Sequence, residues 1–284
     1  MACAMQKCGG VSFEAGLQNS QSPVEIVALE LIFLCTFAFI AGLVDAVVGG
    51  GGLVQLPALL LFLPAPLAAS IPAVFGTNKL ASVCGTGMAL LQYARRVRMN
   101  WSVLRPAGGA ALVFAFVGAD AVTRLNPALL KPLIFALLVA VAIYTYRRKD
   151  FGDFHQPRLR PGHEKLWGVV VGAGIGFYDG FFGPGTGSFL IFIFIGWFGF
   201  DFLHASASAK LINFATNIAA VCYFVATDNV YYTYALPMAL CNVAGSLVGT
   251  KLAIWKGNRF IRGFFLVIVM SLIAKFGYEF LRHR

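Results

Sequence analysis

The sequence carries little charge for its length. Only 12% of its 284 residues are Asp, Glu, Lys or Arg, whereas 59% are hydrophobic, and the mean hydropathy is +0.78. Soluble domains carry about 25% charged residues, so a soluble protein of this composition would lack polar side chains to cover its surface. The composition therefore indicates a protein whose solvent is lipid.

Signatures of enzymes and cofactor sites are also missing. The sequence has no His-Glu-x-x-His, Gly-x-Ser-x-Gly or Gly-x-x-x-x-Gly-Lys-Ser/Thr string, and none of its cysteines are in CxxC spacing. An intramembrane hydrolase or an ATPase therefore has no visible catalytic apparatus. We expect a protein that is not an enzyme and that has no cofactor and no metal site.

Long apolar runs dominate the chain and predict an all-α polytopic membrane protein. Each is long enough to cross a bilayer as a helix, and they lie at about 26–48, 71–94, 103–120, 129–146, 165–183, 203–226, 233–253 and 259–281. Two more apolar runs, Leu53 to Leu63 and Gly187 to Phe200, are short and follow glycine-rich breaks. Runs of this length favour broken or re-entrant helices.

The basic residues predict the orientation. They gather in three connecting segments, at 95–98, 147–165 and 251–262, whereas 227–229 has none. Positive loops favour the cytoplasm, and loop residues of this kind do not form a nucleic-acid surface. If both short runs cross, the chain has ten spans with both termini outside; if they dip in and return, it has eight.

The chain repeats itself. Gly42, Asp45, Gly49 and Gly51 recur 134 positions later as Gly176, Asp179, Gly183 and Gly185. Farther on the offset is 131, so that Lys79 matches Lys210, Ser82 matches Asn213, and Thr86 matches Asn217. We predict a tail at 1–25, a first transmembrane repeat at 26–146, a basic cytoplasmic loop at 147–164 and a second repeat at 165–284. Five spans in each half would make the repeats inverted, as in many secondary transporters.

Two lysines lie inside apolar runs, at equivalent positions of the repeat. A charge at bilayer depth costs at least about 2.5 kcal/mol, so it is retained where it lines a cavity or meets a partner. Each opens a polar stripe on one helix face, Lys79, Ser82 and Thr86 in one half and Lys210, Asn213 and Asn217 in the other. These stripes suggest a site for a small oxyanion. The alternatives are lysines that snorkel to the interface and polar residues that join helices.

The glycine breaks precede the two short runs. Glycine lets the backbone turn, and a helix N-terminus offers unpaired N–H groups and partial positive charge. The residues that would form such anion-binding turns are Gly50, Gly51 and Gly52 in the first half and Gly185, Thr186 and Gly187 in the second. The alternative is close helix packing by small residues.

Asp45 and Asp179 precede the breaks by four residues. Three roles compete: ion pairs with the lysines, bracing of the broken helices, and proton or sodium coupling. We favour pairing or bracing, because a carboxylate that faced an anion would repel it. If they pair, we expect each aspartate to meet the lysine of its own half.

The residues around these positions resemble a known family. The segment from Asp45 to Leu53, with Pro57 and with Gly76-Thr-Asn-Lys-Leu80, resembles the first-half signature of the TauE/SafE sulfite exporter family. The segment from Asp179 to Phe189 and the string Ala209-Lys-Leu-Ile-Asn213 resemble its second half. We group Asn78, inside the first signature, with the aspartates as a structural or coupling residue. The resemblance covers about 26–281 and implies a multi-pass permease of the bacterial inner membrane for sulfite, sulfonates or similar anions.

The leading hypothesis is therefore a secondary transporter that exports a small sulfur-containing oxyanion. A second hypothesis is a cation-coupled carrier or channel for another small solute that uses Asp45 and Asp179. A third is a membrane scaffold subunit that does not transport. The expected partners are a small inorganic or organic anion and the lipid bilayer, and self-association into a homo-oligomer is left open.

Overall fold

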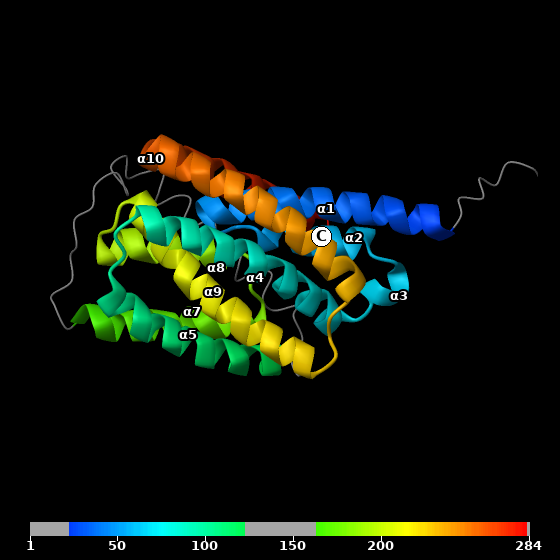
Figure 1. Ribbon diagram of the computed structural model, residues 1–284, viewed down its shortest axis with the longest axis horizontal. Helices are drawn as coiled ribbons and strands as arrows, with labels where there is room; N and C mark the ends of the chain where they lie inside the picture. Colours follow the sequence, from blue (N-terminus) through cyan, green and yellow to red (C-terminus); the bar gives the residue numbers. More distant parts are fainter. Residues whose placement is uncertain (1–22, 123–162, 283–284) are drawn as a thin grey trace, which may run out of the picture.

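The computed structural model describes residues 23–122 and 163–282, and these residues are mostly helical and form no strand (Figure 1). The first half contains α1 (Pro23–Val48), α2 (Gly52–Phe62), α3 (Ala65–Ala68), α4 (Ile71–Arg96) and α5 (Trp101–Val122). The second contains α7 (His163–Phe181), α8 (Thr186–Ile193), the π-helix η2 (Phe194–Phe198), α9 (Phe202–Ala226) and α10 (Tyr232–Arg282). The predicted tail up to 22, the span 129–146 and the loop up to 162 lie outside the described residues.

Four described helices are long and apolar enough to cross a membrane: they contain Leu29–Val48, Trp101–Ala121, Phe202–Ala226 and Tyr232–Ile261. Helix α4, with 26 residues, is also of spanning length but contains the polar stripe around Lys79. Helix α10 is interrupted at Gly257, whose φ of 65° and ψ of −161° are not helical. This interruption separates the two runs predicted at 233–253 and 259–281.

The two short helices follow the glycine breaks, as predicted. Helix α2 has 11 residues, and at about 1.5 Å per residue it is roughly 16 Å long, about half the bilayer core. Helix α8 has 8 residues before η2 continues it. Helices α1 and α7 stop at Gly49 and Gly183, whose φ values of 75° and 87° lie in the left-handed region that glycine adopts without a Cβ penalty.

The two halves pack in a symmetric pattern. Helix α1 packs on α10 and α5 packs on α7, while α4 and α9 contact each other in the centre (Figure 1). Gly42 lies against the backbone of Asn242, and its counterpart Gly176 lies against the backbone of Ala111 in the same way. In Figure 1 the chain runs along α4 and α9 in opposite directions. This arrangement is compatible with the predicted inverted repeat.

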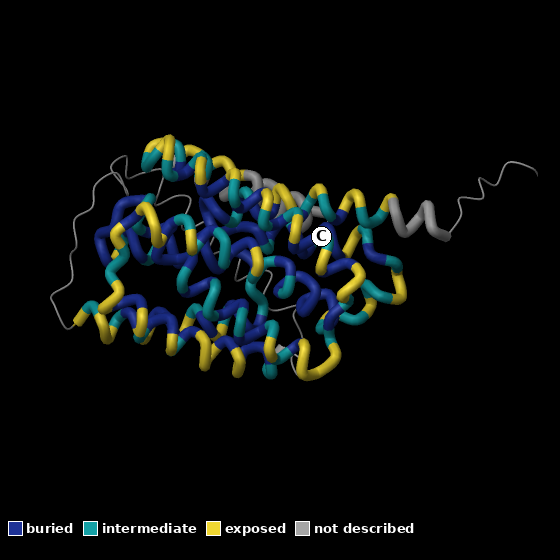
Figure 2. Tube along the Cα trace, viewed as in Figure 1, coloured by how far each residue is buried: buried dark blue, intermediate teal, exposed yellow. Residues whose placement is uncertain are grey.

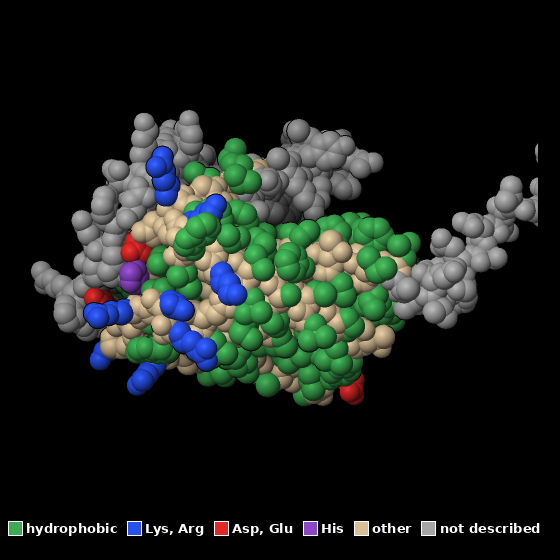
Figure 3. All heavy atoms as spheres, turned by 45° about the horizontal axis from the view of Figure 1, so that its top comes forward, with side chains coloured by type: hydrophobic (Ala, Val, Ile, Leu, Met, Phe, Trp, Pro, Cys, Tyr) green, Lys and Arg blue, Asp and Glu red, His purple; other side chains and the backbone are tan. Residues whose placement is uncertain are grey.

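The outer surface of the bundle is apolar. Figure 2 shows the buried residues on the inner sides of the helices and the exposed ones on the outside. Large hydrophobic side chains point outward, with exposures of 75% for Leu61, 75% for Leu240 and 80% for Trp255. Figure 3 shows Lys and Arg side chains near one end of a broadly hydrophobic face. An exposed apolar surface of this extent belongs to a multi-pass membrane protein.

Candidate functional site

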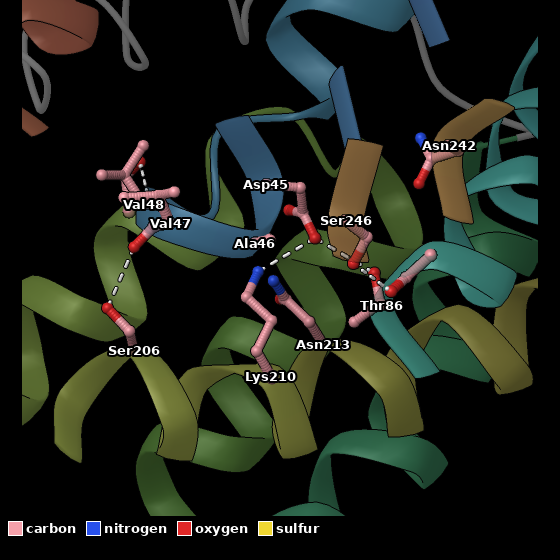
Figure 4. A network of polar contacts seen from close by, with 12 residues as sticks. Asp45, Ala46, Val47, Val48, Thr86, Ser206, Lys210, Asn213, Asn242 and Ser246 are labelled. Atoms are coloured by element: carbon pink, nitrogen blue, oxygen red, sulfur yellow. Dashed lines mark hydrogen bonds and ion pairs between the residues drawn. The ribbon is translucent and has the colours of Figure 1, made fainter. Parts of the chain in front are cut away.

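The end of α1 is bonded to three other helices. The last carbonyls of a helix have no partner within it, so at bilayer depth they need donors from elsewhere. The hydroxyls of three side chains supply them: Tyr93 donates to Ala46 O at 2.9 Å and Ser188 to Val48 O at 2.9 Å, and Ser206 donates to Val47 O at 3.0 Å (Figure 4). The break in α1 is therefore held in place by α4, α9 and α8.

The two breaks contact each other through backbone atoms. A Cβ added to Gly49 would lie 2.3 Å from the Cα of Gly187, and one added to Gly52 would lie 3.5 Å from the Cα of Pro184. Only glycine fits at the first of these contacts. The two interrupted helices, far apart in the sequence, thus meet at one place, as expected for broken helices of an internal repeat.

The first of two charged clusters lies beside the break in α1. Lys210 Nζ on α9 donates to Asp45 Oδ2 at 2.9 Å, and Thr86 Oγ1 on α4 donates to the same oxygen at 3.1 Å (Figure 4). The side chain of Lys210 is fully buried, whereas that of Asp45 is 17% exposed. We call Lys210, Asp45 and Thr86 the Lys210 cluster.

The second cluster lies beside the break in α7. Lys79 Nζ on α4 donates to Asp179 Oδ2 at 2.8 Å and to Asn217 Oδ1 on α9 at 3.1 Å. Both charged side chains are buried, with exposures of 4% and 5%. A Cβ added to Gly183 would lie 3.0 Å from Lys79 Nζ, so the glycine leaves room for the ammonium group. We call Lys79, Asp179 and Asn217 the Lys79 cluster.

The two clusters are exchanged by the internal repeat. Lys79 corresponds to Lys210, Asp179 to Asp45, and Asn217 to Thr86. In both clusters the lysine comes from one half and the aspartate from the other. The expectation of pairing within one half is therefore wrong. Its physical reason is that α4 and α9 cross in the centre, which brings each lysine to the broken helix of the opposite half.

The predicted anion-binding turns are closed by hydrogen bonds of their own. At the start of α2, Gly50 O accepts from Leu53 N at 3.1 Å and Gly51 O from Val54 N at 3.0 Å, and of the predicted backbone donors Thr186 N donates to Gly183 O at 3.3 Å. At the start of α8, the Thr186 hydroxyl donates to Gly183 O at 2.7 Å, and Gly185 is left-handed with φ 83°. The glycine segments therefore form turns that begin short helices, and they bring Gly51 against the Asp45 side chain.

Asn213, Asn78 and Ser82 stand outside the two clusters. Asn213 is 5% exposed, its amide lies against Gly187, and its Oδ1 has no hydrogen-bond partner among the described residues. Asn78 is 4% exposed, and its Oδ1 likewise lacks a described partner. Ser82 is half-buried. A buried carbonyl oxygen without a donor is costly, so both amides are suited to receive a donor from a ligand or water.

Sequence reasoning missed several buried polar residues. Besides the three hydroxyls that cap α1, Gln55 accepts a hydrogen bond from Asn242 Nδ2 at 2.8 Å, and Ser246 donates to Gly85 O at 2.6 Å. A signal was present for two of the capping residues. Ser206 lies four residues before Lys210, and Tyr93 lies seven residues after Thr86. Each therefore shares a helix face with a residue of the predicted polar stripes.

Two interrupted helices that meet, with buried charges at the meeting point, define the class of the protein. Secondary transporters place their sites at discontinuous helices of two repeats, and intramembrane ionisable groups mark transport pathways.

The chain belongs to the TauE/SafE sulfite exporter family, whose family model matches residues 34–276. Relatives with similar length bear the description probable membrane transporter protein. One from Sinorhizobium sp, ORF9, is 37% identical over 86% of this chain and 91% of its own length. One from Haemophilus influenzae is 31% identical over 88% of this chain and 95% of its own length. YfcA from Escherichia coli K12 is 29% identical over 92% of this chain and 94% of its own length. No solved structure matches the chain.

The protein is thus a multi-pass membrane transporter, and its bacterial relatives are consistent with the inner membrane. The names of these relatives describe transporters and give no substrate.

Proposed function

We propose that the protein is a secondary transporter that moves a small sulfur-containing oxyanion, such as sulfite or an organosulfonate, out of the cell without ATP. The family description points to sulfite. The observation that carries the proposal is the pair of buried lysines at the two helix breaks, Lys79 and Lys210. In this proposal the two repeats are inverted, and they expose the same site to either side in turn.

The oxyanion takes over the lysines from the aspartates. A lysine ammonium has three donors, and Lys210 uses one of them for Asp45. An oxyanion that approaches the ammonium as closely as the carboxylate does, at 2.9 Å, has about 6 kcal/mol of attraction to it before desolvation, at an effective dielectric constant near 20, and this matches the attraction lost with the carboxylate that it replaces. Asn213 lies beside Lys210 (Figure 4), and its Nδ2 group, which is next to Gly187, is a donor that can add a hydrogen bond to the oxyanion.

The proposal is tested by flux in liposomes that contain only this protein. Lys79→Met and Lys210→Met keep the length of the side chain and remove its charge, so each is expected to lower sulfite and sulfonate flux at least tenfold. Lys251→Met is the matched control, because Lys251 is exposed on α10 and its substitution should leave flux unchanged. Lys210→Arg keeps the charge but replaces a compact ammonium with a planar fork, so we expect only partial flux.

The proposal fails if wild-type protein carries neither sulfite nor a sulfonate, or if both buried-lysine variants carry them at the wild-type rate. A carrier in which Asp45 and Asp179 bind a free cation is less well supported, because both carboxylates are bonded to lysine. A scaffold subunit is also less well supported, since helix anchoring needs neither buried ion pairs nor interrupted helices.

A further inference from the structure

The charges of the two clusters balance. Each contains one lysine and one aspartate in direct contact, at 2.8 Å and 2.9 Å. The two short helices beside the clusters, α2 and α8, contain no ionisable side chain among their described residues. The site without substrate is therefore electrically neutral. It can switch its opening from one side of the membrane to the other without moving a net charge through the low-dielectric interior of the membrane.

A bound anion would upset this balance. If it took the place of a carboxylate on a lysine, it would leave a buried aspartate charged beside a new negative charge. Two negative charges that lie close together disfavour ionisation, so either the aspartate or the anion would take up a proton. The anion itself, when it is the conjugate base of a strong acid, cannot do so, and the proton has to go to the protein.

We infer, building on the proposed anion transport, that the protein carries each monovalent oxyanion together with one proton, which is held on Asp45 while Lys210 holds the anion. On loading, the Lys210–Asp45 contact breaks, a proton from the aqueous phase binds Asp45 Oδ2, and the ammonium bonds to the anion. On release at the other side, the anion leaves, the proton returns to water, and the ion pair re-forms. The empty and the loaded site have the same net charge.

The choice of Asp45 over Asp179 follows from their surroundings. The Asp45 side chain is 17% exposed, whereas that of Asp179 is 5% exposed, so Asp45 is the more accessible of the two carboxylates. The titratable groups that face Asp45 are Lys210 on α9 and the phenol of Tyr93 on α4. Those that face Asp179 are Lys79 on α4 and Tyr178 on its own helix.

Around Asp45 the neighbouring helices otherwise offer uncharged polar groups. Thr86 donates to it at 3.1 Å, and α10 presents Ser246 nearby (Figure 4). The Tyr93 hydroxyl is already bonded to Ala46 O at 2.9 Å, so Lys210 is the group that exchanges partners. A divalent oxyanion would engage both clusters and carry two protons by the same exchange.

The experiment uses wild-type protein in liposomes with an entrapped pH-sensitive dye, equal pH on both sides and the membrane potential held at zero by potassium and valinomycin. The probe is methanesulfonate, a monovalent anion of a strong acid that cannot itself carry a proton. An inward methanesulfonate gradient should acidify the interior with one proton for each anion taken up, measured with labelled anion in parallel. Protein-free liposomes are the control for leakage.

Potassium gradients then impose 100 mV of either sign. A monovalent anion that moves alone is redistributed about 50-fold by this potential, whereas anion moving with one proton should change its steady accumulation less than twofold. Uptake without acidification, with accumulation that follows the potential, would overturn the coupling and leave the proposed transport standing. Uptake of neither methanesulfonate nor sulfite would instead remove the transport itself.

Asp45→Asn and Asp179→Asn separate the two clusters. Asparagine imitates a protonated carboxyl group, so Asp45→Asn should carry methanesulfonate without acidification and respond to potential, whereas Asp179→Asn should keep one proton for each anion. Equal coupling in both variants would contradict the assignment to Asp45. If either variant fails to fold, the wild-type proton-to-anion ratio still decides whether coupling occurs.

Discussion

Pairing across the two halves predicts which double substitutions rescue which single ones. Lys79→Met would leave Asp179, 5% exposed, without its cation. The two groups lie 2.8 Å apart, which corresponds to about 6 kcal/mol of attraction at an effective dielectric constant near 20. Because desolvation offsets much of this, the measured loss should be about 3–5 kcal/mol, the range for a buried pair that loses one partner.

Removing both charges of one pair should restore most of the stability, because no uncompensated charge remains. Lys79→Met with Asp179→Asn is therefore expected to lie within about 1 kcal/mol of wild type. Lys79→Met with Asp45→Asn is the matched control: it removes the same kinds of charge but leaves Asp179 and Lys210 both unpaired. Its loss should be about the sum of two single losses, roughly 6–10 kcal/mol.

The assay is the temperature at which detergent-solubilised protein loses its monodisperse peak in size-exclusion chromatography. For chains of this size each kcal/mol shifts the midpoint by about 2–4 °C, so the single variant should fall by roughly 6–20 °C and the cross-half double variant should recover. Equal rescue by Asp179→Asn and Asp45→Asn would refute pairing across the halves, and an unchanged midpoint in the single variant would refute a stabilising contact.

Two further substitutions test the helix breaks by the same assay. Gly49→Ala should prevent folding or lower the midpoint strongly, because φ is 75° and the added Cβ would lie 2.3 Å from the backbone of α8. The control is Gly174→Ala, where a Cβ meets nothing within 4 Å, and it should be neutral or slightly stabilising. A similar loss in both variants would contradict the contact between the breaks. Tyr93→Phe should cost about 1–3 kcal/mol, because it leaves the buried carbonyl of Ala46 without its donor. Tyr232→Phe, at a tyrosine that is 50% exposed, should have little effect, and an equally small effect of Tyr93→Phe would show that the cap contributes little.

The sequence was sufficient to predict the long helices among the described residues, the two breaks and the four charged residues of the clusters. Long apolar runs determine spanning helices because lipid cannot satisfy an open backbone, and the glycine-rich segments marked where α1 and α7 stop. The repeat also identified Lys79 and Lys210 as equivalent. It did not reveal their partners, since a repeat establishes which positions correspond and not which positions touch.

The pairing depends on how the halves pack. Asp45 and Lys79 belong to neighbouring helices of one half, so proximity along the chain favoured them as partners. The contact of α4 with α9 in the centre instead places each lysine beside the opposite broken helix. The hydroxyl caps of α1 were missed for a similar reason: Ser188 and Ser206 are unremarkable in their own helices and acquire their role from the carbonyls of a helix in the other half.

Pairing across the halves also has a consequence for synthesis at the ribosome. Lys79 precedes Asp179 by 100 residues, and Asp45 precedes Lys210 by 165. At a synthesis rate of about 5–20 residues per second, Asp179 is made roughly 5–20 s after Lys79, and Lys210 is made roughly 8–33 s after Asp45. During that time the inserted first half contains an acid and a base that have to rely on water, the insertion machinery or each other. Arrival of the second half exchanges these temporary contacts for the native ones, so joining the halves and neutralising the first half's buried charges are the same event.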